Sequence, residues 1–262
     1  MNVLQINSVY SFGSTGRIVA DIKTNLDIRG HYGYVAYGRG ENSFENDEEF
    51  IKIGTKMDVY THVIKNRIFD NQGFNSTRST KNLISKLEKL DIDLIHLHNL
   101  HGYYINLEIL FEFLKKSNIP VVWTLHDCWA FTGHCTHFDY INCNKWTEKC
   151  ENCPEKNSYP SSYWLDQSEK NYLRKKELFN SIEDITIVTP SNWLHSKVKQ
   201  SFLNDNKIVT IYNGIDIDKF SYKNKNKELI NKYNLEGKFL ILGVANIWTE
   251  RKGLNSFIEL SK

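Results

Sequence analysis

The chain has 262 residues, of which 40% are hydrophobic, 24% charged and 13% aromatic. This composition excludes a disordered tail, a collagen-like fibre and a small disulfide-stapled peptide. With 33 Lys and Arg against 31 Asp and Glu, the net charge of +2 gives no reason to expect nucleic acid as a partner.

Short runs rich in Val, Ile and Leu alternate along the chain with longer segments of helical period. The runs predict strands over Asn2–Ser8, Tyr34–Tyr37, Phe50–Gly54, Leu94–His98, Val121–His126, Ile185–Thr189, Ile208–Tyr212 and Phe239–Val244. The periodic segments predict helices over Leu83–Leu90, Leu107–Leu114, Ser168–Ile182 and Asn192–Phe202, the last with Ser191 as its N-cap. This alternation indicates an α/β fold, a Rossmann-like parallel sheet with flanking helices.

Two segments interrupt the alternation. Residues 128–165 show neither period and form an irregular Cys-rich insert, and residues 215–226 are polar and charged, as in a linker. We therefore predict a first domain over residues 1–214, a linker over 215–226 and the beginning of a second Rossmann-like domain over 227–262. One strand with its flanking helices buries too little surface to be stable alone. This favours a chain cut from a longer two-domain protein over a tail packed on the first domain.

The N-terminal segment has no basic region ahead of a long apolar core, so it does not resemble a signal peptide. No stretch approaches the roughly 18–20 uninterrupted apolar residues of a membrane span. We therefore expect a cytoplasmic protein, in which clustered cysteines bind metal more often than they form disulfides. Residues 166–262 carry 16 basic against 12 acidic side chains, which permits peripheral contact with the inner face of a membrane.

Ligands of open parallel sheets bind beyond the carboxyl ends of the strands, where two early segments carry candidate residues. The turn after the first strand could hold an anion on the amides that open the next helix, and its residues are Gly13, Ser14, Thr15 and Gly16. A simple tight turn is the alternative. In HLHNLHG, His96 and His98 share a strand face, and His98 and His101 lie near the strand end, where an imidazole could contact a sugar hydroxyl or a phosphate oxygen. Structural, hydrogen-bonded histidines are the alternative.

Two later segments follow strands in the same way. His126 and Asp127 could contact an acceptor or hold the floor of a cleft, the alternative being that Asp127 caps a turn. Arg251, Lys252 and Gly253 place two cations at a helix start, which suits a diphosphate, although such a pair is more often a solvated surface.

The insert contains a separate cluster of thiols, spaced Cys135-x7-Cys143-x6-Cys150-x2-Cys153. Four thiols supply enough ligands for one tetrahedral zinc, which would be structural because no coordination position stays open for a substrate. His134 and His137 are alternative ligands, and free thiols or redox pairs are alternative states.

Together these features resemble retaining glycosyltransferases of family 4, which have the two-domain GT-B fold. The most specific segments are VTPSNWLHSKVKQS and VTIYNGIDIDKF, where the family signature NG-I/V-D-x-x-x-F is met by Asn213, Gly214, Ile215, Asp216 and Phe220. The segment TLHDCWAFTGHC, with the cysteines that follow, resembles a subgroup of bacterial enzymes that build surface polysaccharides such as capsule.

The resemblance implies transfer of a hexose, with retention, from a nucleotide-diphosphate sugar to a glycan or lipid-linked acceptor. It places donor phosphate at the Gly13–Gly16 turn and at Arg251, Lys252 and Gly253, with His98 near the reacting sugar. The first arginine of the family's R-x4-K-G pattern falls near Asn246, and its E-x7-E motif would lie beyond Lys262. Asp127 is assigned to catalysis with His98, and His101 and His126 to the acceptor.

The mechanism expected for such an enzyme needs no metal, because no Asp-x-Asp stands at a strand end to hold Mg²⁺ on the diphosphate. Arg251 and Lys252 would stabilise the departing nucleoside diphosphate while the acceptor hydroxyl attacks from the same face. A catalytically incomplete or degenerate glycan-binding module of the same fold is the alternative. A zinc hydrolase using the histidine cluster is a third interpretation, which would need metal at His98.

Overall fold

The computed structural model describes residues 1–40, 47–221, 226–245 and 247–261. They divide into two compact units, Met1–Asn213 and Gly214–Lys262, and each is described by itself. The strands of the first unit are β1 (Asn2–Val9), β2 (Tyr32–Arg39), β3 (Phe50–Lys52), β4 (Leu94–Leu97), β5 (Val121–Thr124), β6 (Ile185–Thr189) and β7 (Lys207–Thr210). Its helices are α1 (Gly13–Ile28), α2 (Lys56–Phe69), α3 (Thr77–Leu87), α4 (Leu107–Ser117), α5 (Ser168–Phe179) and α6 (Asn192–Gln200).

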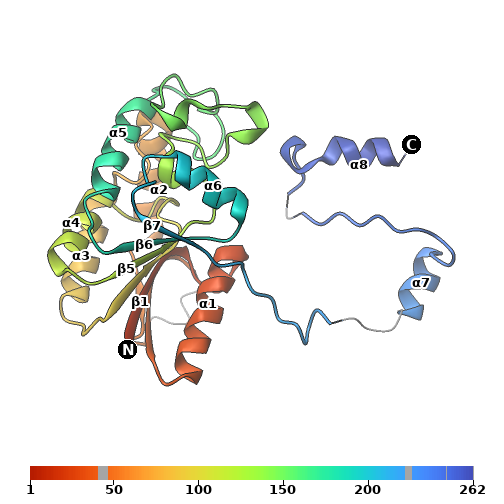
Figure 1. The fold of residues 1–262 in the computed structure, drawn as a ribbon, viewed down its shortest axis with the longest axis horizontal. Helices are drawn as coiled ribbons and strands as arrows, with labels where there is room; N and C mark the ends of the chain where they lie inside the picture. The colour runs from red at the N-terminus through yellow and green to blue at the C-terminus, as the bar shows by residue number, and fades with distance from the viewer. Residues whose placement is uncertain (41–46, 222–225, 246, 262) are drawn as a thin grey trace. The chain divides into compact units, whose positions relative to one another are not determined.

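The described strands form one parallel sheet in the order β3-β2-β1-β4-β5-β6-β7. The chain proceeds outward from β1 to β3, then returns to place β4 on the other side of β1. Helix α1 connects β1 to β2 and α4 connects β4 to β5, and these helices lie on opposite sides of the sheet (Figure 1). The predicted α/β class, a Rossmann-like sheet with flanking helices, is confirmed.

Alternate side chains of the strands build two apolar layers. Leu4 and Ile6 of β1 belong to the larger cluster, which also contains the buried side chains of α3, α4 and α5. Val35 and Tyr37 of β2 belong to a smaller cluster with Val19 of α1. The sheet is therefore covered on both faces, which explains why its strands are continuously apolar in sequence.

The predicted strands of the first unit differ from the observed ones by a few residues at their ends. Ser191 caps α6 as predicted, with its hydroxyl accepting from Leu194 N at 3.2 Å. Helix α2 was not predicted, because its buried face is polar: His62 and Asn66 are its buried residues. A search for apolar periodicity does not detect such a helix.

The second unit contains α7 (Lys227–Tyr233), a 3-10 helix over Glu250–Lys252 and α8 (Leu254–Leu260). The predicted strand over Phe239–Val244 is wrong for this structure, since the segment has no assigned strand. A strand needs a neighbour to satisfy its backbone N–H and C=O groups, and no neighbouring strand accompanies it among residues 226–245 and 247–261. Asn246, part of the 215–226 linker and Lys262 lie outside the described residues.

The insert between β5 and α5 consists of loops with short 3-10 helices at Trp129–Phe131, Asp139–Ile141 and Lys145–Thr147. Its interior is aromatic: the rings of Phe138 and Trp146 stack with centroids 4.6 Å apart, and Phe131 lies 5.4 Å from Trp146. The insert also lies directly against α5, because a Cβ added at Gly133 would stand 2.1 Å from the Ser168 carbonyl oxygen.

A Gly133→Ala variant is therefore expected to lose about 3 kcal/mol or more of its free energy of unfolding, since backbone would have to move to admit one methyl group. Urea unfolding followed by tryptophan fluorescence measures this loss. Gly214→Ala is the matched control, because a Cβ there meets nothing within 4 Å. Equal stability of the two variants would contradict the proposed contact.

Candidate functional site

The carboxyl ends of β1 and β4 lie side by side where the strand order reverses, and this is the place where open α/β sheets bind ligands. Asn7, fully buried near the end of β1, connects the two segments that follow these strands. Its Nδ2 donates to Val9 O at 2.7 Å and to Thr15 Oγ1 at 3.5 Å, and its Oδ1 accepts from Asn99 N at 3.2 Å. One side chain therefore joins the Gly13–Gly16 turn to the loop after β4.

The Gly13–Gly16 turn opens α1, and no side chain caps that helix end. Gly13 has a φ of +66°, in the left-handed region that glycine tolerates best. Gly16 is buried, and a Cβ there would stand 3.2 Å from Ser11 N. With Gly13 and Ser14 exposed, this uncapped helix start is open to solvent, and phosphate binding there stays a prediction.

Three histidines, His96, His98 and His126, lie close together at the carboxyl ends of β4 and β5, and we call them the histidine row. His96 Nε2 lies 2.8 Å from Thr124 Oγ1, and His98 Nδ1 lies 3.2 Å from His126 Nε2. The rings of His96 and His98 have centroids 4.1 Å apart. Burial lowers the pKa of His96 and of His126 to about 4, and burial together with the two neighbouring rings holds the pKa of His98 well below its usual value. The row is therefore uncharged at neutral pH.

His98 itself is only 1% exposed, and its Nε2 has no hydrogen-bond partner among the described residues. An unpaired buried nitrogen is costly unless a ligand or water satisfies it. The predicted role of His98 at the reacting sugar thus stays a prediction, which requires substrate access to this nitrogen.

A second chain of polar groups runs beside this row. His101 Nε2 lies 2.7 Å from Asp127 Oδ2, and His101 Nδ1 lies 3.1 Å from the Tyr159 hydroxyl. Burial raises the pKa of Tyr159 to about 12, so its hydroxyl keeps its proton. The arrangement suits a hydrogen on Nε2 shared with the carboxylate, and Nδ1 accepting from the tyrosine.

Asp127 is ionised in spite of its burial. Burial favours the neutral acid, but the electrostatic interaction with His101, its hydrogen bond and the Trp129 amide together lower the pKa of Asp127 below its usual value. Asp127 Oδ1 accepts from Trp129 N at 2.9 Å, and Trp129 is buried. The structural interpretation, a capped turn with Trp129 in the core, is therefore confirmed, and the same carboxylate still presents Oδ2 to His101.

Three residues near this site were missed in the sequence. Arg39 ends β2, and its guanidinium lies 3.6 Å from the position that a Cβ would take at Gly102. Tyr103 has a φ of +67° and packs edge-on against Tyr159, which belongs to the insert. Arg39 could have been proposed from the sequence, because it stands at the end of an apolar strand, as the other candidate residues do. The position of Tyr159 depends on the path of an irregular loop, which no periodicity specifies.

Arg251 and Lys252 belong to the second unit, where both are exposed in the 3-10 helix that precedes α8. Gly253 follows with a φ of +76° and forms the N-cap position of α8 without a side-chain cap. Two cations thus precede an uncapped helix start, as the sequence predicted. Their role in holding a diphosphate stays a prediction.

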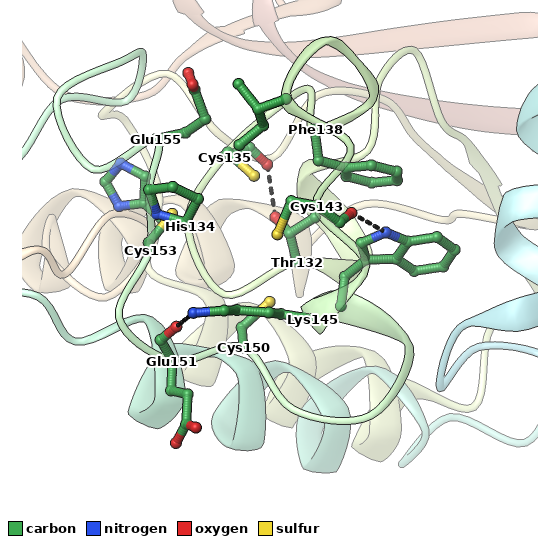
Figure 2. A pocket seen from close by; sticks show the side chains of 13 residues that line it. Thr132, His134, Cys135, Phe138, Cys143, Lys145, Cys150, Glu151, Cys153 and Glu155 are labelled. Atoms are coloured by element: carbon green, nitrogen blue, oxygen red, sulfur yellow. Dashed lines mark hydrogen bonds between the residues drawn. The ribbon is translucent and has the colours of Figure 1, made fainter.

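The thiols of Cys135, Cys143, Cys150 and Cys153 all line one pocket of the insert (Figure 2). His134 also lines it, whereas the second candidate ligand, His137, does not. As placed, no group of three or more His, Cys, Asp or Glu side chains in the described ranges is arranged to hold a metal ion. The sequence therefore identified which thiols meet, and zinc stays a prediction.

No described helix combines the length and apolar character that crossing a bilayer requires.

Comparison with known proteins identifies the family. The sequence model of Glycosyltransferase Family 4 matches residues 15–219. A protein of Escherichia coli (strain K12) named as a colanic acid biosynthesis glycosyl transferase, WcaC, is 26% identical over 229 residues, covering 83% of this chain and 55% of that protein. The processive diacylglycerol alpha-glucosyltransferase of Acholeplasma laidlawii is 31% identical over 78 residues, covering 29% of this chain and 23% of that enzyme.

Among solved structures, the sucrose-phosphate synthase of Thermosynechococcus elongatus matches with a TM-score of 0.52 at 10% identity, covering 89% of this chain and 52% of that one. This likeness supports the fold, which is that of GT-B glycosyltransferases. The chain spans about half the length of WcaC and less of the Acholeplasma enzyme. Since the family model covers most of the sequence, the chain belongs to Glycosyltransferase Family 4.

Proposed function

We propose that this protein takes part in transfer of a hexose, with retention of configuration, from a nucleotide-diphosphate sugar to a glycan or lipid-linked acceptor in polysaccharide biosynthesis. The observation that carries the proposal is the meeting of two segments at the reversal point of the sheet. There, Asn7 joins an uncapped helix start to the loop of His98 and His101. Family membership and the names of the two relatives support the same chemistry.

On this proposal the donor diphosphate binds at the start of α1, where the helix dipole gives a positive electrostatic potential. The first-turn amides of α1 would receive the negative charge that develops on the leaving group. Such preorganised donors act in the transition state without reorientation. In the second unit, the exposed side chains of Arg251 and Lys252 are separate candidates for binding phosphate. The acceptor hydroxyl attacks from the face that the diphosphate leaves, and its proton passes to the departing phosphate oxygen.

The ionised Asp127 and the neutral histidine row would each contact the sugar in a different way. The anionic Asp127, paired with His101, would stabilise positive charge on the sugar ring as the glycosidic bond breaks. His98 would give its unpaired Nε2 to a sugar hydroxyl, which would remove the cost of an unsatisfied buried nitrogen.

The test is a screen of nucleotide sugars with the protein encoded by the complete reading frame, followed by NMR of the product's anomeric proton. A retained configuration is expected. An inverted product would overturn the mechanism, and donor binding without any turnover would favour the glycan-binding alternative.

We further propose that the acceptor is reached at a membrane surface, through the exposed face of α2. Met57, Tyr60 and Ile64 are 71%, 63% and 58% exposed and share one face of that helix. Trp164 of the insert is 74% exposed, and its neighbours Tyr163 and Leu165 hydrogen-bond through their amides to Arg67 O and Ile68 O. The exposed cations of α2 are Lys56, Lys65 and Arg67. Aromatic and basic side chains around an apolar stripe suit an anionic bilayer surface.

An Ile64→Ser/Trp164→Ser double variant is therefore expected to bind vesicles containing phosphatidylglycerol at least about tenfold more weakly than the unchanged protein, since it removes two of the four exposed apolar side chains. Vesicle co-sedimentation measures the binding. Ile28→Ser is the matched control, because Ile28 is 76% exposed on α1. Equal loss in both variants, or no binding by the unchanged protein, would refute the membrane surface.

A further inference from the structure

The Cys-rich insert brings four thiols from distant positions to one place. Cys135, Cys143, Cys150 and Cys153 line a pocket of about 10 Å³, which has room for one water-sized sphere (Figure 2). The fifth cysteine, Cys128, is buried outside this pocket. The convergence is thus selective, since the thiol that is absent from the spaced pattern is also absent from the pocket.

Hydrogen bonds with polar side chains fix the backbone at three of the four cysteines. Thr132 Oγ1 donates to Cys135 O at 2.6 Å, and Trp146 Nε1 donates to Cys143 O at 3.1 Å. Cys153 N donates to Asp166 Oδ2 at 2.6 Å.

The turn between Cys150 and Cys153 is held separately. Lys145 Nζ donates to the carbonyls of Glu151 and Asn152 at 2.9 and 3.2 Å. The backbone around the pocket is therefore held by contacts that do not involve sulfur. The Cys135 and Cys153 thiols already hydrogen-bond to each other.

A buried lysine holds the backbone next to the same pocket. Lys175 of α5 is 1% exposed, and its Nζ donates to the carbonyls of Trp129 and Thr132 at 2.8 and 3.1 Å. Thr132 lines the pocket, so this contact fixes one wall of it.

We propose that this pocket binds one structural Zn²⁺ through the thiolates of Cys135, Cys143, Cys150 and Cys153. Four thiols lose four protons to solvent as four Zn–S bonds form, which gives a complex of charge −2. The thiols of the structure are not yet in a metal-binding arrangement, so binding rotates them inward on their anchored backbone. This inference does not depend on the proposed transferase activity.

His134 is the competing ligand, because it lines the pocket and its Nε2 has no hydrogen-bond partner among the described residues. Its Nδ1 lies 2.5 Å from Asp70 Oδ1, as in histidines that bind a metal through the other nitrogen. Four thiolates are favoured because all four cysteines line the same pocket, whereas the other nitrogen of His134 is engaged by Asp70. The experiment separates the two ligand sets.

The experiment measures zinc by mass spectrometry of the elements in the chain purified under reducing conditions without an affinity tag. One zinc per chain is expected, with release when the thiols are modified by a mercurial. Replacement by Co²⁺ should give the visible bands and the sulfur-to-metal charge-transfer band of a tetrahedral thiolate site.

Cys143→Ser and Cys150→Ser are expected to lose the metal, whereas Cys128→Ser and His134→Asn should retain it. Absence of zinc from the unchanged protein, together with failure of Co²⁺ to produce thiolate bands, would overturn the proposal even if no variant folds. Retention of zinc in Cys143→Ser combined with its loss in His134→Asn would overturn the ligand set.

Discussion

An Asp127→Asn variant of the protein encoded by the complete reading frame is expected to transfer sugar about 10²–10⁴-fold more slowly, as when a positioned charge is lost from an active site. The variant removes the negative charge that faces His101 Nε2 at 2.7 Å. It keeps an oxygen that can accept from Trp129 N, so the turn below the site should persist. Initial rates with the donor found in the nucleotide-sugar screen measure the effect.

The control is stability, because a collapsed turn would also abolish activity. Asp127→Asn should unfold within about 1 kcal/mol of the unchanged protein, since only one of two hydrogen bonds is weakened. His101→Gln should lower the rate as well, and the double variant should lose less than the product of both single effects, because the two side chains act as a pair. An unchanged kcat in Asp127→Asn would remove this carboxylate from the mechanism.

Acidification below about pH 6.5 is expected to destabilise the fold by several kcal/mol through its buried histidines. Burial lowers the pKa of His62 to about 3, with Lys65 adding to the effect, and burial lowers the pKa of His96 and His126 to about 4. The unfolded chain takes up protons near pH 6.5 while these rings stay neutral in the fold. Their contribution to stability is therefore complete above pH 6.5 and is lost as the pH falls toward about 4.

Urea unfolding at pH 7.5 and pH 5 measures this difference. His62→Gln should be less sensitive to acid than the unchanged protein by roughly 1–2 kcal/mol over that interval, because one titrating ring is removed. His62 is a suitable probe since it lies in α2 and contacts Ser76 and Gly73 rather than the histidine row. An identical loss in both proteins would show that the acid response arises elsewhere.

The sequence predicted the sheet well, because strands buried on both faces must be apolar and several of them are followed by a helical period. It also predicted which side chains follow the strands, and the parallel topology then brought His98, His126 and the Gly13–Gly16 turn to one edge. Helix α2 was not predicted because its buried residues are polar. His62 hydrogen-bonds to Ser76, and Asn66 donates to the carbonyls of Pro160 and Ser161. Hydrogen bonds of this kind produce no apolar periodicity in the sequence.

The contacts between side chains of the site could not be predicted from the sequence either. Nothing in the spacing of residues indicates that Tyr159 reaches His101 across the insert, or that Asn7 serves two loops at once. The predicted strand over Phe239–Val244 failed for a related reason. Its composition favours a strand, but a strand is completed by its neighbour, and a single sequence window contains no information about that neighbour.

That same segment has a practical consequence. Phe239, Leu242 and Val244 are 92%, 84% and 86% exposed in a stretch without an assigned strand. An exposed apolar segment of high strand propensity can pair with the open edge of a sheet, including that of another molecule. Concentrated samples should therefore form oligomers that Leu242→Lys disperses, and storage conditions should be chosen with light scattering as the guide.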